Sequence, residues 1–258
     1  AQVTVVDTVG SLHFTESATI ALPLHIPKTL QVKAYTADKT PIILTNQDIE
    51  WSVTPDSLAQ INSDGVLTPL AQGQGLVIAR LGDKEATINF IAGLESQLID
   101  DYELQDNNAY FIDGYVGGSS AVSSQQVKTG QYSLKVDYDY ANWDRVYNGT
   151  INIKLKGDER NPGYTSYIQP KKIGMWVYGD GQAPWLRAII KDGHQNSHII
   201  NLAPQINWTG WQYVSAPISS DLPLPITLDY FYMVETNKAK NLKGTVYFDD
   251  IRFIYTDM

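Results

Sequence analysis

The chain has no cysteine and few positive charges. Its 258 residues include 19 Lys and Arg against 28 Asp and Glu, which gives a formal net charge of −9. Without thiols, neither a disulfide framework nor a thiolate metal site can form. Nucleic-acid binding depends on clustered Lys and Arg, and no such stripe occurs in either half of the chain. We therefore expect no nucleic-acid partner.

Long apolar runs and sustained helical periodicity are also missing. No stretch approaches the length of a membrane-spanning helix, and residues 1–20 lack the charged and apolar zones of a signal peptide. We expect no membrane insertion, and any targeting signal to have been removed or to lie upstream in a longer parent. The balance of 43% hydrophobic and 18% charged residues is typical of a folded globular protein.

Aromatic residues are scarce in the first third of the chain and abundant afterwards. Four of the 28 Phe, Trp and Tyr residues precede residue 94: Phe14, Tyr35, Trp51 and Phe90. This shift predicts two domains, 1–93 (with residues 1–10 as a lead-in strand) and 94–258. In both domains short apolar strands alternate with turn signals, so we predict an all-β fold.

Three motifs characterise the first domain: I-E-W-S-V-T-P at 49–55, I-N-S-D-G-V-L-T-P at 61–69 and A-Q-G-Q-G-L-V-I-A-R at 71–80. In this order they resemble the bacterial immunoglobulin-like (Big-type) surface domains. The resemblance implies an immunoglobulin-like β-sandwich with Trp51 in its core, serving as a spacer or adhesive module. Asp-Gly chemistry favours a left-handed turn at Gly65.

The second domain combines many short strands with long loops rich in Gly, Asn, Ser and Pro. About eight to ten strands with such connections predict a two-sheet jelly roll. The stretches interpreted as loops are 113–130, 157–171, 179–184 and 219–226.

Five motifs of the second domain resemble the jelly-roll carbohydrate-binding modules of secreted bacterial polysaccharide-active proteins. They are D-Y-E (101–103), K-T-G-Q-Y-S-L-K-V-D-Y (128–138), I-G-M-W-V-Y-G-D-G (173–181), W-T-G-W-Q-Y-V (208–214) and Y-F-D-D-I-R-F (247–253). The two domains together resemble the C-terminal accessory region of exported bacterial phosphodiester-glycosidase-type proteins. The resemblance implies a non-catalytic, extracellular or cell-surface region that binds a polysaccharide or cell-envelope glycan beside an upstream catalytic domain.

Acidic residues near both ends of the second domain suggest a calcium site. Ca²⁺ prefers carboxylate and carbonyl oxygens. In the family that the domain resembles, the acidic residues matching Glu103 and Asp249 hold a structural calcium with loop carbonyls, here near Gln131. The alternative is that Glu103 and Asp249 are surface charges close to Lys128 or Arg252.

Strand alternation predicts a sugar-binding platform. Sugars stack their C–H faces on aromatic rings and need fixed hydrogen-bonding groups for their hydroxyls. In two successive strands, the aliphatic set is expected to face the core. We therefore expect four outward residues on one sheet face: Trp176, Tyr178, Trp185 and Arg187. A second cluster on a predicted edge loop comprises Tyr140, Trp143 and Tyr147. We assign Trp208, Trp211 and Tyr213 mainly to packing.

Two other functions remain open. The acidic pairs 100–101 and 249–250 could serve glycoside hydrolysis in a small lyase or hydrolase, although alternation turns Asp250 toward solvent. The region could instead be purely structural and pack on a missing catalytic domain. His194 and His198 lie on a turn that leads into a strand, which places them poorly for one metal ion.

Overall fold

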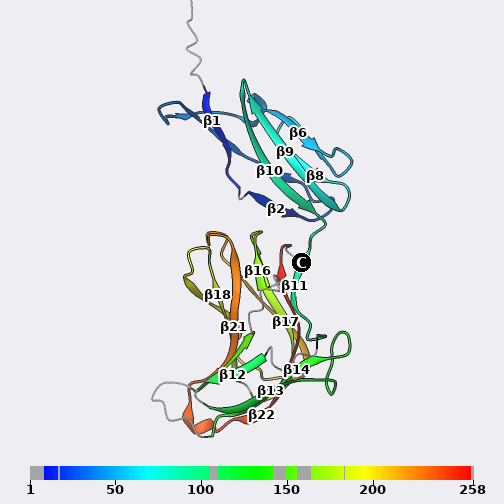
Figure 1. Cartoon of the computed structure of the whole chain (residues 1–258), viewed down its shortest axis with the longest axis vertical. Helices are drawn as coiled ribbons and strands as arrows, with labels where there is room; N and C mark the ends of the chain where they lie inside the picture. The colour runs from blue at the N-terminus through cyan, green and yellow to red at the C-terminus, as the bar shows by residue number, and fades with distance from the viewer. Residues whose placement is uncertain are drawn as a thin grey trace, which may run out of the picture. The chain divides into compact units, whose positions relative to one another are not determined.

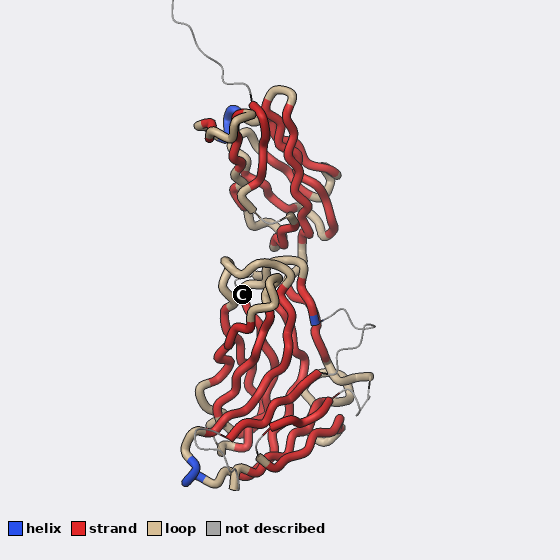
Figure 2. Tube along the Cα trace, turned by 60° about the vertical axis from the view of Figure 1, so that its left-hand side comes forward, coloured by secondary structure: helices blue, strands red, loops and turns tan. Residues whose placement is uncertain are grey.

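A computed structural model describes residues 9–16, 18–104, 110–114, 116–141, 149–155, 164–182 and 184–256. It divides into two compact units, Ala1–Glu95 with Tyr255–Met258, and Ser96–Ile254. Strands are the main secondary structure of both units (Figure 2), and short 3-10 helices span Asn46–Asp48 and Lys238–Lys240. This confirms the predicted all-β class, an immunoglobulin-like sandwich followed by a jelly roll. Within the described ranges, no helix has the length and apolar character needed to cross a membrane.

The first unit is a small β-sandwich. Its strands are β1 (Val9–Phe14), β2 (Thr19–Leu22), β3 (Lys28–Thr29), β4 (Val32–Thr36), β5 (Pro41–Ile42), β6 (Glu50–Thr54), β7 (Ala59–Ile61), β8 (Val66–Pro69), β9 (Gly73–Leu81) and β10 (Lys84–Ala92). They form sheets in the orders β1-β4-β5, β2-β10-β9-β6 and β3-β8-β7. The β2–β10 pair is parallel, whereas β9–β10 and β6–β9 are antiparallel.

Trp51 and Gly65 pack against each other in the first unit. The Trp51 indole packs against Phe14 with ring centroids 6.0 Å apart, and its Nε1 donates to the carbonyl oxygen of Asn46 at 2.9 Å. Gly65 has a φ of +71°, as predicted for its turn, and a Cβ there would lie 2.9 Å from the Trp51 ring. Glycine is therefore needed for both the backbone conformation and the approach of the indole.

The described residues of the second unit form twelve strands. They are β11 (Ser96–Asp100), β12 (Tyr110–Gly114), β13 (Gly117–Ser123), β14 (Ser133–Asp139), β15 (Gly149–Leu155), β16 (Thr165–Ser166), β17 (Lys172–Asp180), β18 (Trp185–Lys191), β19 (Ser197–Ala203), β20 (Thr209–Pro217), β21 (Ile226–Glu235) and β22 (Lys243–Ile254). The β22 sheet has the order β13-β14-β22-β17-β20, with β11 also paired to β22. The β21 sheet has the order β12-β15-β21-β18-β19, with β16 also paired to β21.

The two sheets face each other across a common core. Met175 and Val177 of β17 and Leu186 of β18 are fully buried, as alternation predicts. Phe231 of β21 and Phe248 of β22 meet with ring centroids 4.8 Å apart, so contacts cross directly from one sheet to the other. Figure 1 shows β18 and β21 on one side of this unit and β14 and β17 on the other.

The tertiary arrangement corrects two predictions. First, β17 and β18 are not neighbours on one sheet, because the chain crosses from the β22 sheet to the β21 sheet between them. Second, the stretch 113–130 is not all loop, because it contains β13, which pairs with β14 along its whole length. The β13 sequence G-G-S-S-A-V-S has low strand propensity, so pairing with a neighbour overrides the local preference.

Candidate functional site

The outer side of the β21 sheet carries an apolar cluster separate from the sandwich core. We call this surface the β21 face. Its outward side chains come from β15, β18, β19 and β21: Asn152, Lys154, Trp185, Arg187, Ile189, Asn201, Tyr230, Tyr232 and Val234. Ile189, Tyr232 and Val234 are buried, with Trp185 and Tyr230 packed against them. Because these three residues are almost inaccessible to solvent, the accessible aromatic surface of the β21 face is that of the half-buried Trp185 and Tyr230.

Hydrogen-bonding side chains border the aromatic residues of the β21 face. The Arg187 guanidinium carbon lies 3.2 Å from the Trp185 ring centroid, and Arg187 Nε donates to Asn201 Oδ1 at 2.9 Å. Lys154 Nζ lies 5.9 Å from the centroid of Tyr230. The indole Nε1 of Trp185 is buried and has no acceptor among the described residues. Arg187 therefore covers one side of Trp185, whereas Tyr230 stays half-buried at the border of the cluster.

The outer side of the β22 sheet, which we call the β22 face, is organised differently. Trp176 meets Tyr213 with centroids 5.3 Å apart, and Tyr178 meets Trp211 and Tyr247 at 5.5 and 5.8 Å. The interplanar angles are 65°, 78° and 86°, so each pair is edge-to-face. Such pairs stabilise the fold by contacts with one another. Trp211 and Tyr213 thus have the packing contacts expected of them.

The loop 124–132 adds a cover to the β22 face. Lys128 Nζ lies 4.0 Å from the Trp176 ring centroid, and the Tyr247 hydroxyl donates to Gln125 Oε1 at 3.0 Å. Trp176 therefore has a ring at its edge and an ammonium group over its face. The four residues predicted to form one platform are divided between two faces with different surroundings.

Asp249 anchors this loop from below. Its carboxylate is fully buried, and Oδ2 accepts hydrogen bonds from the N–H groups of Lys128 at 2.9 Å and Thr129 at 3.0 Å. Burial raises the pKa of Asp249, and the neighbouring Asp250 carboxylate adds to the increase, while the loop hydrogen bonds oppose it. The buried charge is thus only partly compensated by the loop.

Glu103 holds the other end of the same loop. Its Oε1 accepts from the N–H groups of Gln131 at 2.8 Å and Tyr132 at 2.9 Å. Gly130 has a φ of +66°, and a Cβ there would lie 2.3 Å from Glu103 Oε1. Among the described residues, no group of three or more His, Cys, Asp or Glu side chains is placed to hold a metal ion. A calcium ion here would depend on two carboxylates, backbone carbonyls and water.

The prediction that Tyr140 belongs to a sugar-binding cluster on an edge loop is wrong. This side chain is fully buried and packs edge-to-face on Tyr138 at a centroid distance of 5.6 Å. The inward alternation of β14, through Leu134 and Val136, continues to Tyr140, and burial raises the pKa of its hydroxyl. Tyr140 therefore cannot stack on a sugar. Trp143 and Tyr147 lie outside the described residues.

The acidic pairs considered for hydrolysis have structural partners. Asp100 accepts from the N–H of Tyr102 at 2.8 Å and from the hydroxyl of Tyr164 at 3.2 Å. Asp250, expected to face solvent, is 9% exposed and accepts from Arg252 Nε at 2.7 Å. A bulge in the β17–β22 register, with Asp250 at a φ of +51°, breaks the simple alternation that the prediction assumed.

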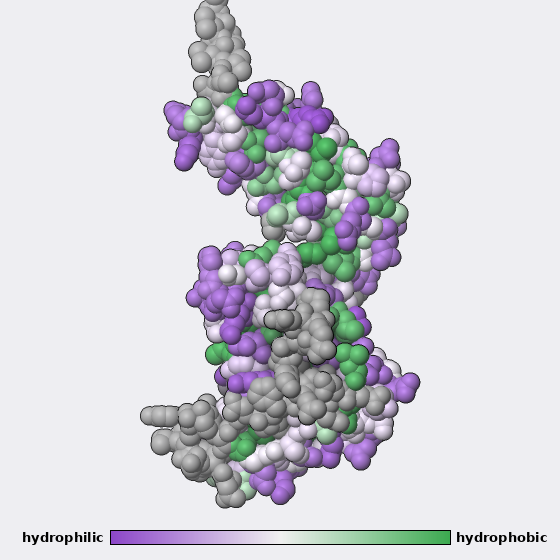
Figure 3. Space-filling model, in the orientation of Figure 1, coloured by the Kyte–Doolittle hydropathy of each residue, from purple (hydrophilic) through white to green (hydrophobic). Residues whose placement is uncertain are grey.

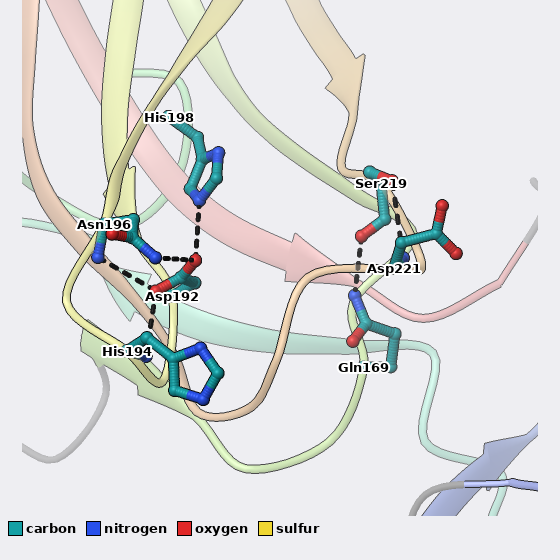
Figure 4. Close-up of polar contacts among 7 residues, drawn as sticks. All are labelled: Gln169, Asp192, His194, Asn196, His198, Ser219 and Asp221. Carbon is teal, nitrogen blue, oxygen red and sulfur yellow. Dashed lines mark hydrogen bonds and ion pairs between the residues drawn. The ribbon is translucent and has the colours of Figure 1, made fainter.

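Asp192 organises the turn between β18 and β19 (Figure 4). One carboxylate oxygen accepts from the N–H groups of His194 and Asn196, both at 2.9 Å. The other lies 2.9 Å from His198 Nε2. The His198 contact is the main cause of a lowered pKa of Asp192. The His194 and His198 rings lie on opposite sides of this carboxylate (Figure 4), so the turn uses them separately.

Comparisons with known proteins found similarity among solved structures. No protein-family model and no curated protein matches the chain. A structure described as carbohydrate-binding modules of the β-sandwich superfamily has 11% identity and a TM-score of 0.44, covering 95% of this chain and 98% of that one.

Two further solved structures each match a little under two thirds of this chain. The CBM27-1 module of Caldicellulosiruptor saccharolyticus, in complex with mannohexaose, has 12% identity and a TM-score of 0.44, covering 63% of this chain and 98% of that one. The family 11 module of the cellulosomal cellulase Lic26A-Cel5E of Clostridium thermocellum has 16% identity and a TM-score of 0.41, covering 62% and 94%.

Proposed function

We propose that the second unit binds a polysaccharide on its β21 face. The observation that carries the proposal is that the half-buried Trp185 and Tyr230 lie outside the sandwich core, packed on the buried apolar cluster of Ile189, Tyr232 and Val234. A sugar ring needs an apolar surface for its C–H groups and polar groups for its hydroxyls. Ligand sites typically combine these two features, with few polar groups in fixed positions.

The polar residues of this face have suitable chemistry. Arg187 carries a planar fork of N–H donors, and the Asn201 side chain offers both donors and an acceptor. Their mutual hydrogen bond of 2.9 Å and the stacking of Arg187 on Trp185 restrict both side chains before any ligand arrives. Preorganisation of this kind lowers the entropy cost of binding. Tyr230 and Lys154 extend the same face along β21 and β15.

The wider role follows from the sequence resemblances. We propose a non-catalytic accessory region of a secreted or cell-surface protein, in which the first unit is a spacer and an upstream domain performs catalysis. The support is the ordered motifs of both domains. In this role, the second unit keeps the parent protein close to its polysaccharide.

The direct test is glycan binding by the full chain. We expect retention on a glycan array and in affinity electrophoresis against at least one polysaccharide, and loss of that retention in Arg187→Ala. Arg80→Ala is a matched control, because Arg80 is a half-exposed arginine of the first unit paired with Glu85. Failure of the wild-type chain to bind any glycan would contradict the proposal, and product release from a polysaccharide would favour the enzyme alternative.

We further propose a structural calcium ion under the loop 124–132. The supporting observation is that Glu103 and Asp249, far apart in sequence, both direct carboxylates at the same short loop. Asp249 is fully buried with a raised pKa, so a cation would offset a cost that the loop N–H groups leave in place. Oxygen-only ligands match the preference of Ca²⁺.

A further inference from the structure

An open groove of about 610 Å³ lies at the lateral edge of the second unit. It is lined by the end of β19, the connection that follows and the middle of β20. Among the described strands, β19 is the last of the β21 sheet and β20 the last of the β22 sheet. The groove therefore belongs to the sides of the two sheets, whereas the β21 face is an outer surface of one sheet.

The groove follows the backbone edge of β20. Four consecutive residues of this strand, from Gln212 to Ser215, line it. Successive side chains of a strand point to opposite faces, so consecutive residues can share one groove only along the strand edge. An edge strand carries N–H and C=O groups that no neighbouring strand pairs. These groups give the groove a row of fixed donors and acceptors.

The side chains of the groove are uncharged. In a chain with a net charge of −9, none of the described residues that line the groove is acidic or basic. Gln205, Asn207 and Gln212 are exposed and contribute carboxamides, each of which donates and accepts hydrogen bonds. This chemistry complements neutral hydroxyl groups and provides no counter-charge for an ionic ligand.

Trp208, which the sequence assigned mainly to packing, is half-buried and supplies a fixed aromatic ring in the same groove. Its Nε1 donates to the carbonyl oxygen of Val177 at 3.3 Å. A Cβ on Gly179 would lie 3.0 Å from Trp208 Cδ1 and 2.3 Å from its carbonyl oxygen, so glycine there lets the Trp208 residue lie against β17. An indole held in this way, beside three carboxamides, combines an apolar surface with polar groups as sugar recognition requires.

We propose that this groove is a second glycan-binding site, which takes a neutral sugar chain along the edge of β20. The proposal rests on the carbohydrate-binding role proposed for this unit, but it concerns different residues. Its ligand class is narrower than that of the β21 face, where Arg187 and Lys154 also suit charged sugars. Both sites together would let one unit hold two chains, or two segments of one chain.

The experiment is an NMR titration of the ¹⁵N-labelled full chain with cellohexaose, mannohexaose and xylohexaose, with hexagalacturonate as the charged comparison. The indole N–H signals, assigned by single Trp→Phe variants, report on the groove through Trp208 and on the β21 face through Trp185. We expect a neutral hexasaccharide to shift the Trp208 signal with saturation and hexagalacturonate to leave it unchanged. The backbone signals of residues 212–215 should follow the Trp208 signal.

Variants separate the two sites. Asn207→Ala combined with Gln212→Ala should weaken the Trp208 response about tenfold or more, since each carboxamide loses its hydrogen bonds to the ligand. The Trp185 response should not change. Gln182→Ala, an exposed amide outside the groove, is the control and should behave as wild type. Arg187→Ala should show the opposite pattern.

Each outcome decides the proposal. A Trp185 response without a Trp208 response would overturn the groove site and leave the β21 face intact. A Trp208 response alone would support the groove and overturn the β21 face. Silence of both signals with every probe would overturn both. If amide exchange along residues 212–215 slows with protein concentration and no sugar, the edge pairs with a second copy of the chain, and the groove proposal fails.

Discussion

The β21 face and the β22 face of the second unit both carry outward aromatic residues, but these residues have different neighbours. On the β22 face, Trp176 and Tyr178 contact other rings edge-to-face, and Lys128 from a loop covers Trp176. On the β21 face, Trp185 contacts Arg187, which is itself bonded to Asn201. Aromatic rings that pack edge-to-face on one another stabilise the sheet. Aromatic rings that lie beside fixed hydrogen-bonding groups can recognise a ligand.

This difference teaches that outward direction alone does not define a binding surface. On the one face drawn in Figure 3, apolar residues lie among hydrophilic ones wherever the surface is described. Single exposed apolar side chains are normal in folded proteins. What distinguishes a candidate site is the combination of an apolar cluster with fixed hydrogen-bonding groups.

The largest expected effect concerns the calcium ion that we propose beside the β22 face. Saturating CaCl₂ should raise the free energy of unfolding, by about 2.7 kcal/mol at a free concentration of 100 times Kd. Asp249→Asn should abolish this increase. Asp137→Asn is the control and should keep it, because Asp137 is half-exposed and pairs with Lys135. Thermal melts in CaCl₂ and in chelator measure this. An identical Tm in CaCl₂ and in chelator would contradict the calcium proposal.

The pH dependence of the calcium effect has a defined sign. Because the pKa of Asp249 is raised in the folded protein, its ionised form costs stability when no cation is bound. As pH falls through this raised pKa, protonation relieves that cost but also removes a calcium ligand. The calcium-dependent increase in Tm should therefore shrink toward acid pH. A constant increase from pH 7 to pH 4 would contradict Asp249 as a ligand.

The second prediction separates packing from recognition. Trp176→Ala should lower the free energy of unfolding by about 2 kcal/mol, less than for a fully buried tryptophan, and leave glycan affinity within about twofold. Trp185→Ala should reduce glycan affinity about tenfold or more, with a smaller loss of stability. Urea denaturation and affinity electrophoresis on both variants measure the two quantities. The reverse pattern would exchange the roles of the two faces.

Each face has a cationic side chain against a tryptophan ring, Arg187 on the β21 face and Lys128 on the β22 face, and substitutions test what each contributes to glycan affinity. Arg187→Lys keeps the charge but loses the planar fork and the stacking on Trp185, so affinity should fall about fivefold to tenfold. Lys128→Ala, which removes the cation over Trp176, should not change affinity measurably. Isothermal titration with the glycan identified on the array measures both. Full affinity in Arg187→Lys would show that charge alone suffices.

The smallest expected effect concerns the turn between β18 and β19, beside the β21 face. The pKa of Asp192 is lowered chiefly by its hydrogen bond to His198, so its contribution to stability is complete above the pKa of about 4 in the unfolded chain. It is lost as pH falls further through the lowered pKa. Asp192→Asn should lower Tm at pH 7, and the difference from wild type should shrink below about pH 4. Melts from pH 2 to pH 7 test this, and a pH-independent difference would contradict it.

Local periodicity determined much of the fold from the sequence alone. The alternation of Met175 and Val177 with Trp176 and Tyr178 predicted which side of β17 is buried, and the Asp-Gly turn predicted the left-handed Gly65. These features depend on neighbouring residues in one strand or turn. The direction of a side chain relative to its own strand is a property of the backbone, which the sequence pattern reports directly.

The partners of each strand were decided only by the tertiary structure. Sequence alternation could not show that β17 and β18 lie in different sheets, that Tyr140 is buried, or that a bulge brings Asp250 to Arg252. It also placed Trp185 outward without revealing the apolar cluster to which Tyr230 and Tyr232 contribute. These facts depend on contacts between segments far apart in the chain, and the period of one strand carries no information about which strand lies beside it.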